Sequence, residues 1–476
     1  MTSGPVAGGG EARPFAALML ALAGGAILVP LNTTMLAVAL PGIMAEFDLG
    51  ANTVASLVTL YLGAVAIALP VSGALADRFG HRRTFVAGVL AFGTASLAAA
   101  LGDVFPLLQG ARLLQAISGA LVSTASVAII REIAPPDRRG EAFGRFDLLT
   151  STSAAVGPFV GGVLIGAFAW RSIFLVCVPL AIASAAAVWK LLPGEPKHDP
   201  ATGPRSIDVP GLVVLGTLIA AILVALRVGP AGVGLVALVA ILPLGAAFLA
   251  VELRTRRPAI DPRLFRSRAF ASAAAGIFGT TVILHGSFIL VPILVESLLG
   301  ASATASGVVL LGVAGVGAIV APWGGRASDR LGRRRLAVVG SLITALGIGA
   351  LAAGMPFVTT TPLPVVLAAI AAALGFVGLG MGLSGAPRQT AALEAVPSGR
   401  AGMGAGTYLT ARYLGGLVGA SLAGAVLQGE VSVTGMSLGF AILAAAGLAV
   451  VAVSLGLPGR ASQVSPPPPS PHSSAA

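Results

Sequence analysis

The chain has very little charge for its length. Only 10 % of its 476 residues are charged and 56 % are hydrophobic, whereas a soluble globular chain is about 25 % charged. No charged residue occurs between Arg13 and Glu46, or between Arg335 and Arg388. These runs exceed the roughly 20 apolar residues that cross a bilayer. Because they are continuous and do not alternate, they predict membrane-spanning helices rather than strands.

Cysteine and lysine are also scarce. The single cysteine, Cys177, excludes an intrachain disulfide. Of 29 basic residues only Lys190 and Lys197 are lysines, and no basic domain lies outside the apolar runs, so no nucleic acid is expected as a partner. The chain has no phosphate-binding G-x-x-x-x-G-K-[ST] loop and no clustered acids, histidines or nucleophiles at membrane depth. We therefore expect neither an enzyme nor a cofactor. The N-terminus also lacks a signal-peptide pattern, so the first run is interpreted as a retained span.

The apolar runs predict fourteen spans. A Pro/Thr segment divides the run 336–386 into two of them. Placing the N-terminus in the cytoplasm puts 25 of the 29 basic residues on the cytoplasmic side, with Arg388 counted as a loop residue and only Arg171 and Arg227 outside. This predicts a multi-pass protein of the plasma membrane with both termini in the cytoplasm. The expected bounds are 15–38, 54–76, 84–102, 105–130, 142–166, 172–191, 209–228, 231–252, 269–295, 303–325, 336–354, 362–386, 402–427 and 434–457.

The signature G-x-x-x-D-R-x-G-x-R-R occurs twice, 252 residues apart, each time between two apolar runs. The repeat indicates two related membrane halves, an organisation typical of transporters. The glycines would allow a tight turn. The aspartate could lie at a helix N-terminus, and the arginines could pair with acids or lipid headgroups. The signature residues are Gly73, Asp77, Arg78, Gly80, Arg82 and Arg83, then Gly325, Asp329, Arg330, Gly332, Arg333 and Arg334.

The repeat and the spans together predict a domain organisation in which two six-helix bundles flank an inserted helix pair. Composition marks the linker and the tails, because Pro-rich polar segments do not fold alone. The expected segments are a cytoplasmic tail 1–14, an N-terminal bundle 15–192, a linker 193–208, the helix pair 209–252, a basic loop 253–268, a C-terminal bundle 269–457 and a disordered Pro/Ser-rich tail 458–476.

With these motifs the chain resembles the major facilitator superfamily, in particular its fourteen-span drug:proton antiporter branch. Arg112-Leu-Leu-Gln115 resembles the family's R-x-x-Q-G-x-G-A motif, and Trp170-Arg171 opens a W-R-x-I-F match. The antiporter motif G-x8-G-x3-G-P-x2-G-G matches at Gly144, Ser153 (for one Gly), Gly157, Pro158, Gly161 and Gly162.

The resemblance implies an all-α membrane protein of two six-helix bundles and two inserted spans. It also implies a monomer in the lipid bilayer that exports a small molecule by alternating access with a proton gradient. Two alternatives stay open: a transporter of another solute with different or no proton coupling, and a transporter-like membrane sensor.

The glycines of the fifth span also have a physical interpretation. Gly157/Gly161 and Gly162/Gly166 are small-x-x-x-small pairs that allow close helix contact, and Pro158 can kink the helix. A kinked, closely packed helix between the halves would suit a rocking motion. Ordinary helix packing is the alternative.

Polar residues inside spans are candidates for substrate binding or proton coupling. Asn32 stands where the resembling family has an aspartate. Since asparagine cannot titrate, either coupling has moved to Asp147 or His285, or the substrate is not cationic, or the protein is no proton antiporter. The full set of candidates is Asn32, Tyr61, Arg112, Gln115, Asp147, His285 and Arg412.

Overall fold

The structure is a computed structural model that describes residues 12–133, 139–192, 209–228, 233–255, 258, 260–396, 401–427 and 431–459. Every regular element in those residues is a helix. The first group is α1 (Ala12–Phe47), α2 (Ala51–Val54), α3 (Ser56–Phe79), α4 (His81–Leu101), α5 (Phe105–Ile133), α6 (Arg139–Phe168), α7 (Ser172–Leu175) and α8 (Cys177–Leu191).

A helix pair separates this first group from a second one. The pair is α9 (Val209–Val228) and α10 (Val233–Arg254). The short helix η1 (Pro262–Arg266) then leads into α11 (Arg268–Pro292), which continues as the π-helix η2 (Ile293–Leu298). The remaining elements are α12 (Ala303–Leu331), α13 (Arg333–Gly354), η3 (Met355–Phe357), α14 (Leu363–Glu394), α15 (Ala401–Val426) and α16 (Val433–Ser454).

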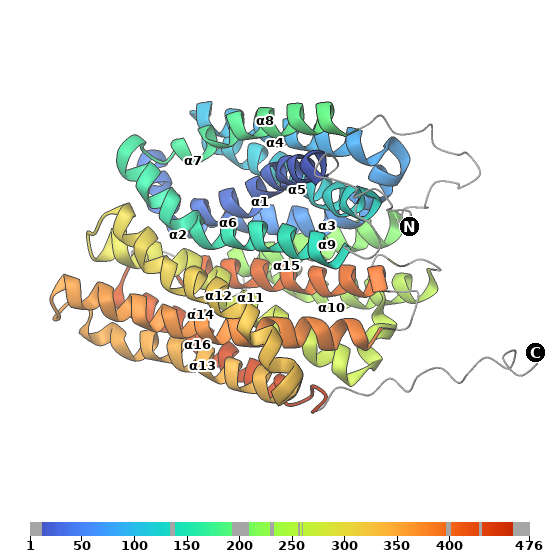
Figure 1. Cartoon of the computed structure of the whole chain (residues 1–476). Coiled ribbons are helices and arrows are strands. Elements are labelled where there is room, and N and C mark those ends of the chain that lie inside the picture. Colours follow the sequence, from blue (N-terminus) through green and yellow to red (C-terminus); the bar gives the residue numbers. More distant parts are fainter. Residues whose placement is uncertain are drawn as a thin grey trace, which may run out of the picture.

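The two groups form two layers of roughly parallel helices, with α1–α8 above α11–α16 in Figure 1. The layers meet where α6 packs against α12 and where α3 packs against α15. Helix α9 contacts α10, α3 and α15, so the helix pair lies beside the seam between the layers. These two helix pairs form the largest contacts between the halves, and α1 adds a smaller one against α11.

Twelve helices among the described residues are long and apolar enough to cross a membrane. The apolar parts of α6 and α9, Thr152–Phe168 and Pro210–Ala225, are shorter. The all-helical membrane fold is confirmed, whereas the count of fourteen spans stays a prediction. The segment boundaries also stay predictions, because the linker 193–208 lies outside the described residues.

Two helices continue through a proline beyond their expected ends. The first span was expected to end at 38, yet α1 continues through Pro41 to Phe47. Likewise α14 continues through Pro387 to Glu394, beyond the expected end at 386. Proline removes one backbone donor and can bend a helix, but the remaining backbone hydrogen bonds allow these two helices to continue.

The repeated signature forms the same turn in both halves. Gly80 ends α3 and begins α4, and Gly332 ends α12 and begins α13. Their φ angles are 91° and 87°, in a region that residues with a Cβ rarely adopt. The expected tight turn is therefore present, and it requires glycine at these two positions. We call the end of the molecule with these turns the motif end, and the opposite end the far end.

Candidate functional site

The centre of the first half contains a fully buried arginine. The side chain of Arg112, on α5, is 0 % exposed. Its Nη1 atom donates to Asn32 Oδ1 on α1 and to Gln115 Oε1, both at 2.7 Å. The ring of Tyr61, on α3, covers the guanidinium, with Cζ 4.3 Å from the ring centroid. Four of the residues singled out from the sequence thus meet in one cluster.

The cluster extends to the outer helices of the same half. Gln115 Nε2 donates to Ser96 Oγ on α4 at 2.8 Å. Asn32 Nδ2 donates to the carbonyl of Ile173 at 3.2 Å and lies 3.6 Å from Cys177 Sγ. Because these groups are buried, each unpaired one would cost about 1–3 kcal/mol. The network therefore fixes the relative positions of α1, α4, α5 and α7.

The charge of Arg112 has no counter-charge among the described side chains. Its hydrogen-bond acceptors are two amide oxygens and, at 3.5 Å, the carbonyl of Leu57. Its Nη2 atom and the hydroxyl of Tyr61 are buried without a hydrogen bond. Because an isolated buried charge is costly, these neutral oxygens and the Tyr61 ring are what stabilises the guanidinium within the described structure.

The second half contains a comparable arginine that the sequence analysis placed wrongly. Arg388 was counted as a loop residue, but it lies within α14 and its side chain is only 1 % exposed. Its guanidinium donates to the hydroxyls of Thr280 at 2.7 Å, of Ser341, and of Ser454 at 3.5 Å. These hydroxyls come from α11, α13 and α16. The preceding Pro387 suggested a helix end, and no sequence signal marked the scattered hydroxyls.

His285 and Arg412 lie together in the second half, outside the Arg112 network. His285 Nδ1 donates to the carbonyl of Thr281 at 3.1 Å, since a carbonyl can only accept. A Cβ at Gly416, on α15, would lie 2.9 Å from the imidazole, so α11 and α15 touch here. Arg412 is within electrostatic range of His285. Its side chain is exposed, and no described residue forms a hydrogen bond or ion pair with its guanidinium.

Four predicted residues have no side-chain description. Asp77, Gly144, Asp147 and Asp329 belong to helices α3, α6 and α12, but their surroundings lie outside the described part of the structure. Their roles stay predictions.

The antiporter-motif glycines in α6 face α1 on one side. A Cβ at Gly157 would collide with Thr34, and one at Gly161 would lie 3.1 Å from Met35 Cα. Ser153 is buried and donates to the carbonyl of Thr150 at 2.7 Å. These contacts require small residues at the two glycine positions.

One more glycine of the motif lies on the seam between the halves. A Cβ at Gly162 would be 2.7 Å from the carbonyl oxygen of Ala303 and 3.3 Å from Gly307 Cα. A Cβ at Gly307 would in turn meet the carbonyl of Pro158. Helices α6 and α12 therefore touch backbone to backbone, which only glycine allows.

In each signature loop, the residue after the turn glycine contacts a glutamate at the motif end. His81, directly after Gly80, lies 2.6 Å from Glu132 at the end of α5. Arg333, directly after Gly332, forms an ion pair with Glu394 at the end of α14. The sequence analysis missed both glutamates, although each ends the fourth helix of its half.

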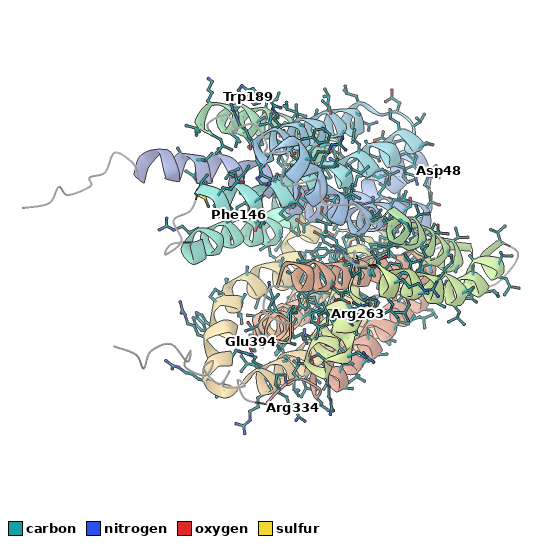
Figure 2. The ribbon with its side chains drawn as sticks, turned by 90° about the vertical axis from the view of Figure 1, so that its right-hand side faces the viewer. Asp48, Phe146, Trp189, Arg263, Arg334 and Glu394 are labelled. Carbon is teal, nitrogen blue, oxygen red and sulfur yellow. The ribbon has the colours of Figure 1, made fainter. Side chains whose placement is uncertain are left out.

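Other signature arginines have different surroundings. Arg82 lies over the ring of Trp189, 4.2 Å from its centroid, and donates to its carbonyl. Figure 2 shows Trp189 on the first half, and Arg334 and Glu394 on the second. Arg78, Arg83, Arg330 and Arg334 are exposed, as expected for residues that bind lipid headgroups or solvent.

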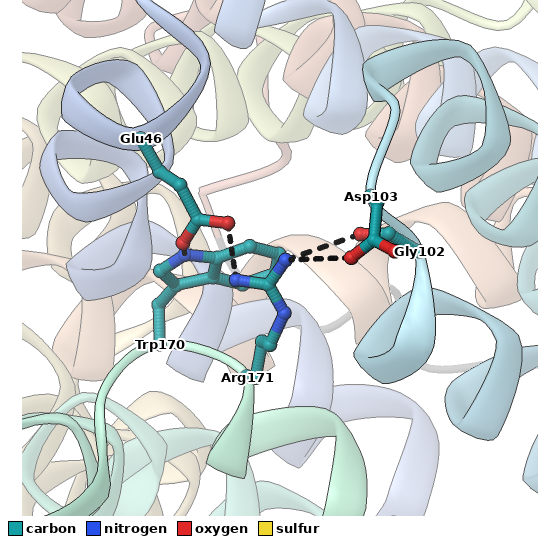
Figure 3. Close-up of polar contacts among 5 residues, drawn as sticks. All are labelled: Glu46, Gly102, Asp103, Trp170 and Arg171. Carbon is teal, nitrogen blue, oxygen red and sulfur yellow. Dashed lines mark hydrogen bonds and ion pairs between the residues drawn. The ribbon is translucent and has the colours of Figure 1, made fainter.

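A second polar cluster closes the far end of the first half (Figure 3). Glu46, at the end of α1, accepts from Trp170 Nε1 at 2.6 Å and pairs with Arg171. Arg171 also donates to the carbonyl of Gly102 at 3.2 Å and lies 3.7 Å from Asp103. The Trp170-Arg171 match thus ties α1, α4 and α7 together.

Two layered helical halves, a repeated turn and buried polar groups at membrane depth define a polytopic membrane transporter. Sequence comparison makes this specific, because the family model of the Major Facilitator Superfamily matches residues 22–420 and 274–475. The chain belongs to the Major Facilitator Superfamily.

Several curated proteins are similar to it over most of their length. An uncharacterised MFS-type transporter of Bacillus subtilis, YvkA, is 30 % identical over 93 % of this chain and 96 % of its own. A multidrug resistance protein B homologue of Mycobacterium tuberculosis is 32 % identical over 84 % of this chain and 74 % of its own. The tetracenomycin C resistance and export protein of Streptomyces glaucescens is 30 % identical over 89 % and 78 %.

Solved structures agree on the fold. A D-xylose–proton symporter superposes with a TM-score of 0.64 at 16 % identity, covering 94 % of this chain and 98 % of the symporter. A partially occluded, inward-open xylose transporter of E. coli gives 0.60 at 15 % identity, covering 92 % and 97 %. At such identities the likeness concerns the fold alone.

Proposed function

We propose that this protein exports small amphipathic molecules, such as drugs, antibiotics or metabolites, from the cytoplasm by alternating access. One observation carries the proposal: where α6 meets α12, the halves touch through their glycine backbones at Gly162 and Gly307. Such a smooth seam allows two rigid halves to rock against each other. The names of the relatives, a multidrug resistance protein and an antibiotic export protein, support export as the direction.

The proposed topology has fourteen spans, with the motif end in the cytoplasm. Helices α6 and α9 have 30 and 20 residues, and about 1.5 Å per residue makes 20 residues roughly 30 Å long, enough for the hydrocarbon core. The basic residues of both signature loops lie at the motif end, as the positive-inside bias requires. Both termini would then be cytoplasmic, and no partner chain is needed.

The proposed energy source is a proton gradient, with Asp147 and His285 as the titrating candidates. One contact supports His285 as a candidate, because its Nε2 atom keeps a free lone pair when Nδ1 donates to the carbonyl of Thr281. No bound cofactor is part of the proposal.

The test uses proteoliposomes that contain the purified chain and a pH-sensitive dye, with cationic, neutral and anionic drugs added across an imposed proton gradient. We expect drug-triggered proton flux that is lost in Asp147→Asn or His285→Ala. Movement of a drug without proton flux would show that the protein is a uniporter or an exchanger and not a proton antiporter. A ligand-dependent conformational shift without movement of any compound would favour a sensor instead.

A further inference from the structure

Three arginines lie inside helices at membrane depth without a described carboxylate partner. They are Arg112 on α5, Arg388 on α14 and Arg412 on α15. Each ion pair among the described side chains lies at a helix end, between other residues. These three arginines are therefore not neutralised by a described carboxylate. The buried acids Glu252 and Asp261 lie elsewhere, at the end of α10 and directly before η1.

The three arginines differ in what they can still bind. The side chain of Arg388 is enclosed and reaches three hydroxyls. Arg112 is enclosed and held by two amides, with Nη2 unpaired. Arg412 alone is exposed, and its guanidinium has no hydrogen bond within the described structure. Because arginines within a membrane face the protein interior or water rather than lipid, Arg412 is available to a molecule that enters between the halves.

Arg412 and the Arg112 cluster approach each other across the seam. A Cβ at Gly63, on α3, would lie 3.1 Å from Leu417 Cδ1, little more than one turn after Arg412 on α15. Gly63 is two residues from Tyr61, whose ring covers Arg112. Helix α15 packs directly against α3, which carries Tyr61. A molecule bound at Arg412 is thus close to the positive charge of Arg112. The neighbouring Asn32 is neutral and does not cancel that charge.

We infer that Arg412 binds an anionic group of the transported molecule, such as a carboxylate, sulfonate or phenolate, and that Arg112 adds a second positive charge from the other half. The inference rests on the proposed transport function and specifies its substrate class. It also gives a reason for Asn32. An interior-negative membrane potential drives an anion outward, so export does not require a titrating acid beside Arg112.

The first test measures binding to the detergent-purified full chain by calorimetry. The probes share one ring system and differ in charge: naphthalene sulfonate, naphthalene sulfonamide and naphthyl trimethylammonium. We expect the sulfonate to bind at least about tenfold more tightly than the other two, as one charge-assisted hydrogen bond provides. Equal affinities, or tighter binding of the ammonium probe, would overturn the inference.

Variants locate the site. Arg412→Gln should weaken sulfonate binding about tenfold and leave sulfonamide binding unchanged, whereas Arg412→Lys, which retains the charge, should lose much less. Arg268→Gln is the matched control, since Arg268 is an exposed arginine at the start of α11. An equal loss in Arg268→Gln, or none in Arg412→Gln, would refute the assignment of Arg412.

A third variant tests the part played by Asn32. Asn32→Asp places a carboxylate next to Nη1 of Arg112 and neutralises its field. The ratio of sulfonate to ammonium affinity should then fall at least about tenfold. An unchanged ratio in a variant with a parental unfolding temperature would exclude Arg112 from anion recognition.

Transport in proteoliposomes separates this inference from the proposed function. Transport of the cationic probe without transport of the anionic probe would support the proposed transport function. It would overturn the inference that the substrate is anionic. Sulfonate binding at Arg412 without transport of any probe would overturn export and keep the anion site. Potential-driven movement of the sulfonate that Arg412→Gln abolishes would support both.

Discussion

Replacing Gly162 by alanine should force α6 and α12 apart. The added Cβ would lie 2.7 Å from the carbonyl oxygen of Ala303, 3.2 Å from Thr304 Cα and 3.3 Å from Gly307 Cα. All three are backbone atoms, so no side chain can rotate away. Overpacking of this kind costs about 1–3 kcal/mol. If another conformation relieves the clash, the described conformation becomes about 5- to 150-fold less populated relative to it.

The far end provides a reporter for this shift. Asn52, on α2, lies against Gly424 of α15, where a Cβ would be 3.2 Å from Asn52 Oδ1. In an Asn52→Cys chain, separation of the halves at this end should expose the new thiol. The native Cys177 is fully buried, so it contributes little background. The assay is the labelling rate with a bulky maleimide in detergent, compared with a chain that lacks Asn52→Cys.

The control is Gly315→Ala in α12. A Cβ there would meet only the side chain of Leu311, at 3.9 Å, and alanine improves helix propensity by up to about 1 kcal/mol. We expect faster labelling in Gly162→Ala and a parental rate in Gly315→Ala. Parental labelling with parental transport in Gly162→Ala, or an equal rise in Gly315→Ala, would refute the argument that backbone contact at this position holds the halves together.

Three further predictions concern stability, measured as thermal unfolding in detergent. Gly80→Ala should lower the free energy of unfolding by about 1–3 kcal/mol, because φ is 91° at this turn. Unfolding of this variant is followed by the reaction of the exposed Cys177 thiol with a thiol-reactive dye. An unchanged midpoint temperature of unfolding would contradict the requirement for glycine at this turn. Asn32→Ala should cost about 1–3 kcal/mol, since Arg112 Nη1 loses an acceptor. Here tryptophan fluorescence is the better measure, because Cys177 itself contacts Asn32, and a neutral effect would mean that Gln115 alone satisfies the arginine. Glu46→Gln should cost less than about 1 kcal/mol, since its ion pair is partly exposed, and a larger loss would show that the far-end cluster is coupled to the core.

The comparison with the sequence analysis is most instructive for the two fully buried arginines. Arg112 stands in the middle of an apolar run, and a charged residue in such a run is recognisable from the sequence as a candidate functional residue. Arg388 followed Pro387 at the end of a run, and the same logic placed it in a loop. Only the packed structure shows that α14 continues past the proline and that hydroxyls from three other helices enclose the guanidinium. Those hydroxyls are far apart in the chain and have no common spacing.

The sequence by itself determined the environment, the helical class and the twofold repeat. Long uncharged runs can satisfy their backbone in lipid only as helices, and the duplicated signature requires two related halves whose turns need Gly80 and Gly332. The tertiary structure alone decided which polar groups meet. It brought Asn32, Tyr61, Arg112 and Gln115 into one cluster, and it set Gly162 against α12. It left the guanidinium of Arg412 without a hydrogen bond to any described residue. Contacts between separate helices depend on the rotation and depth of each helix, and hydropathy, which records only whether a residue suits lipid, does not encode either.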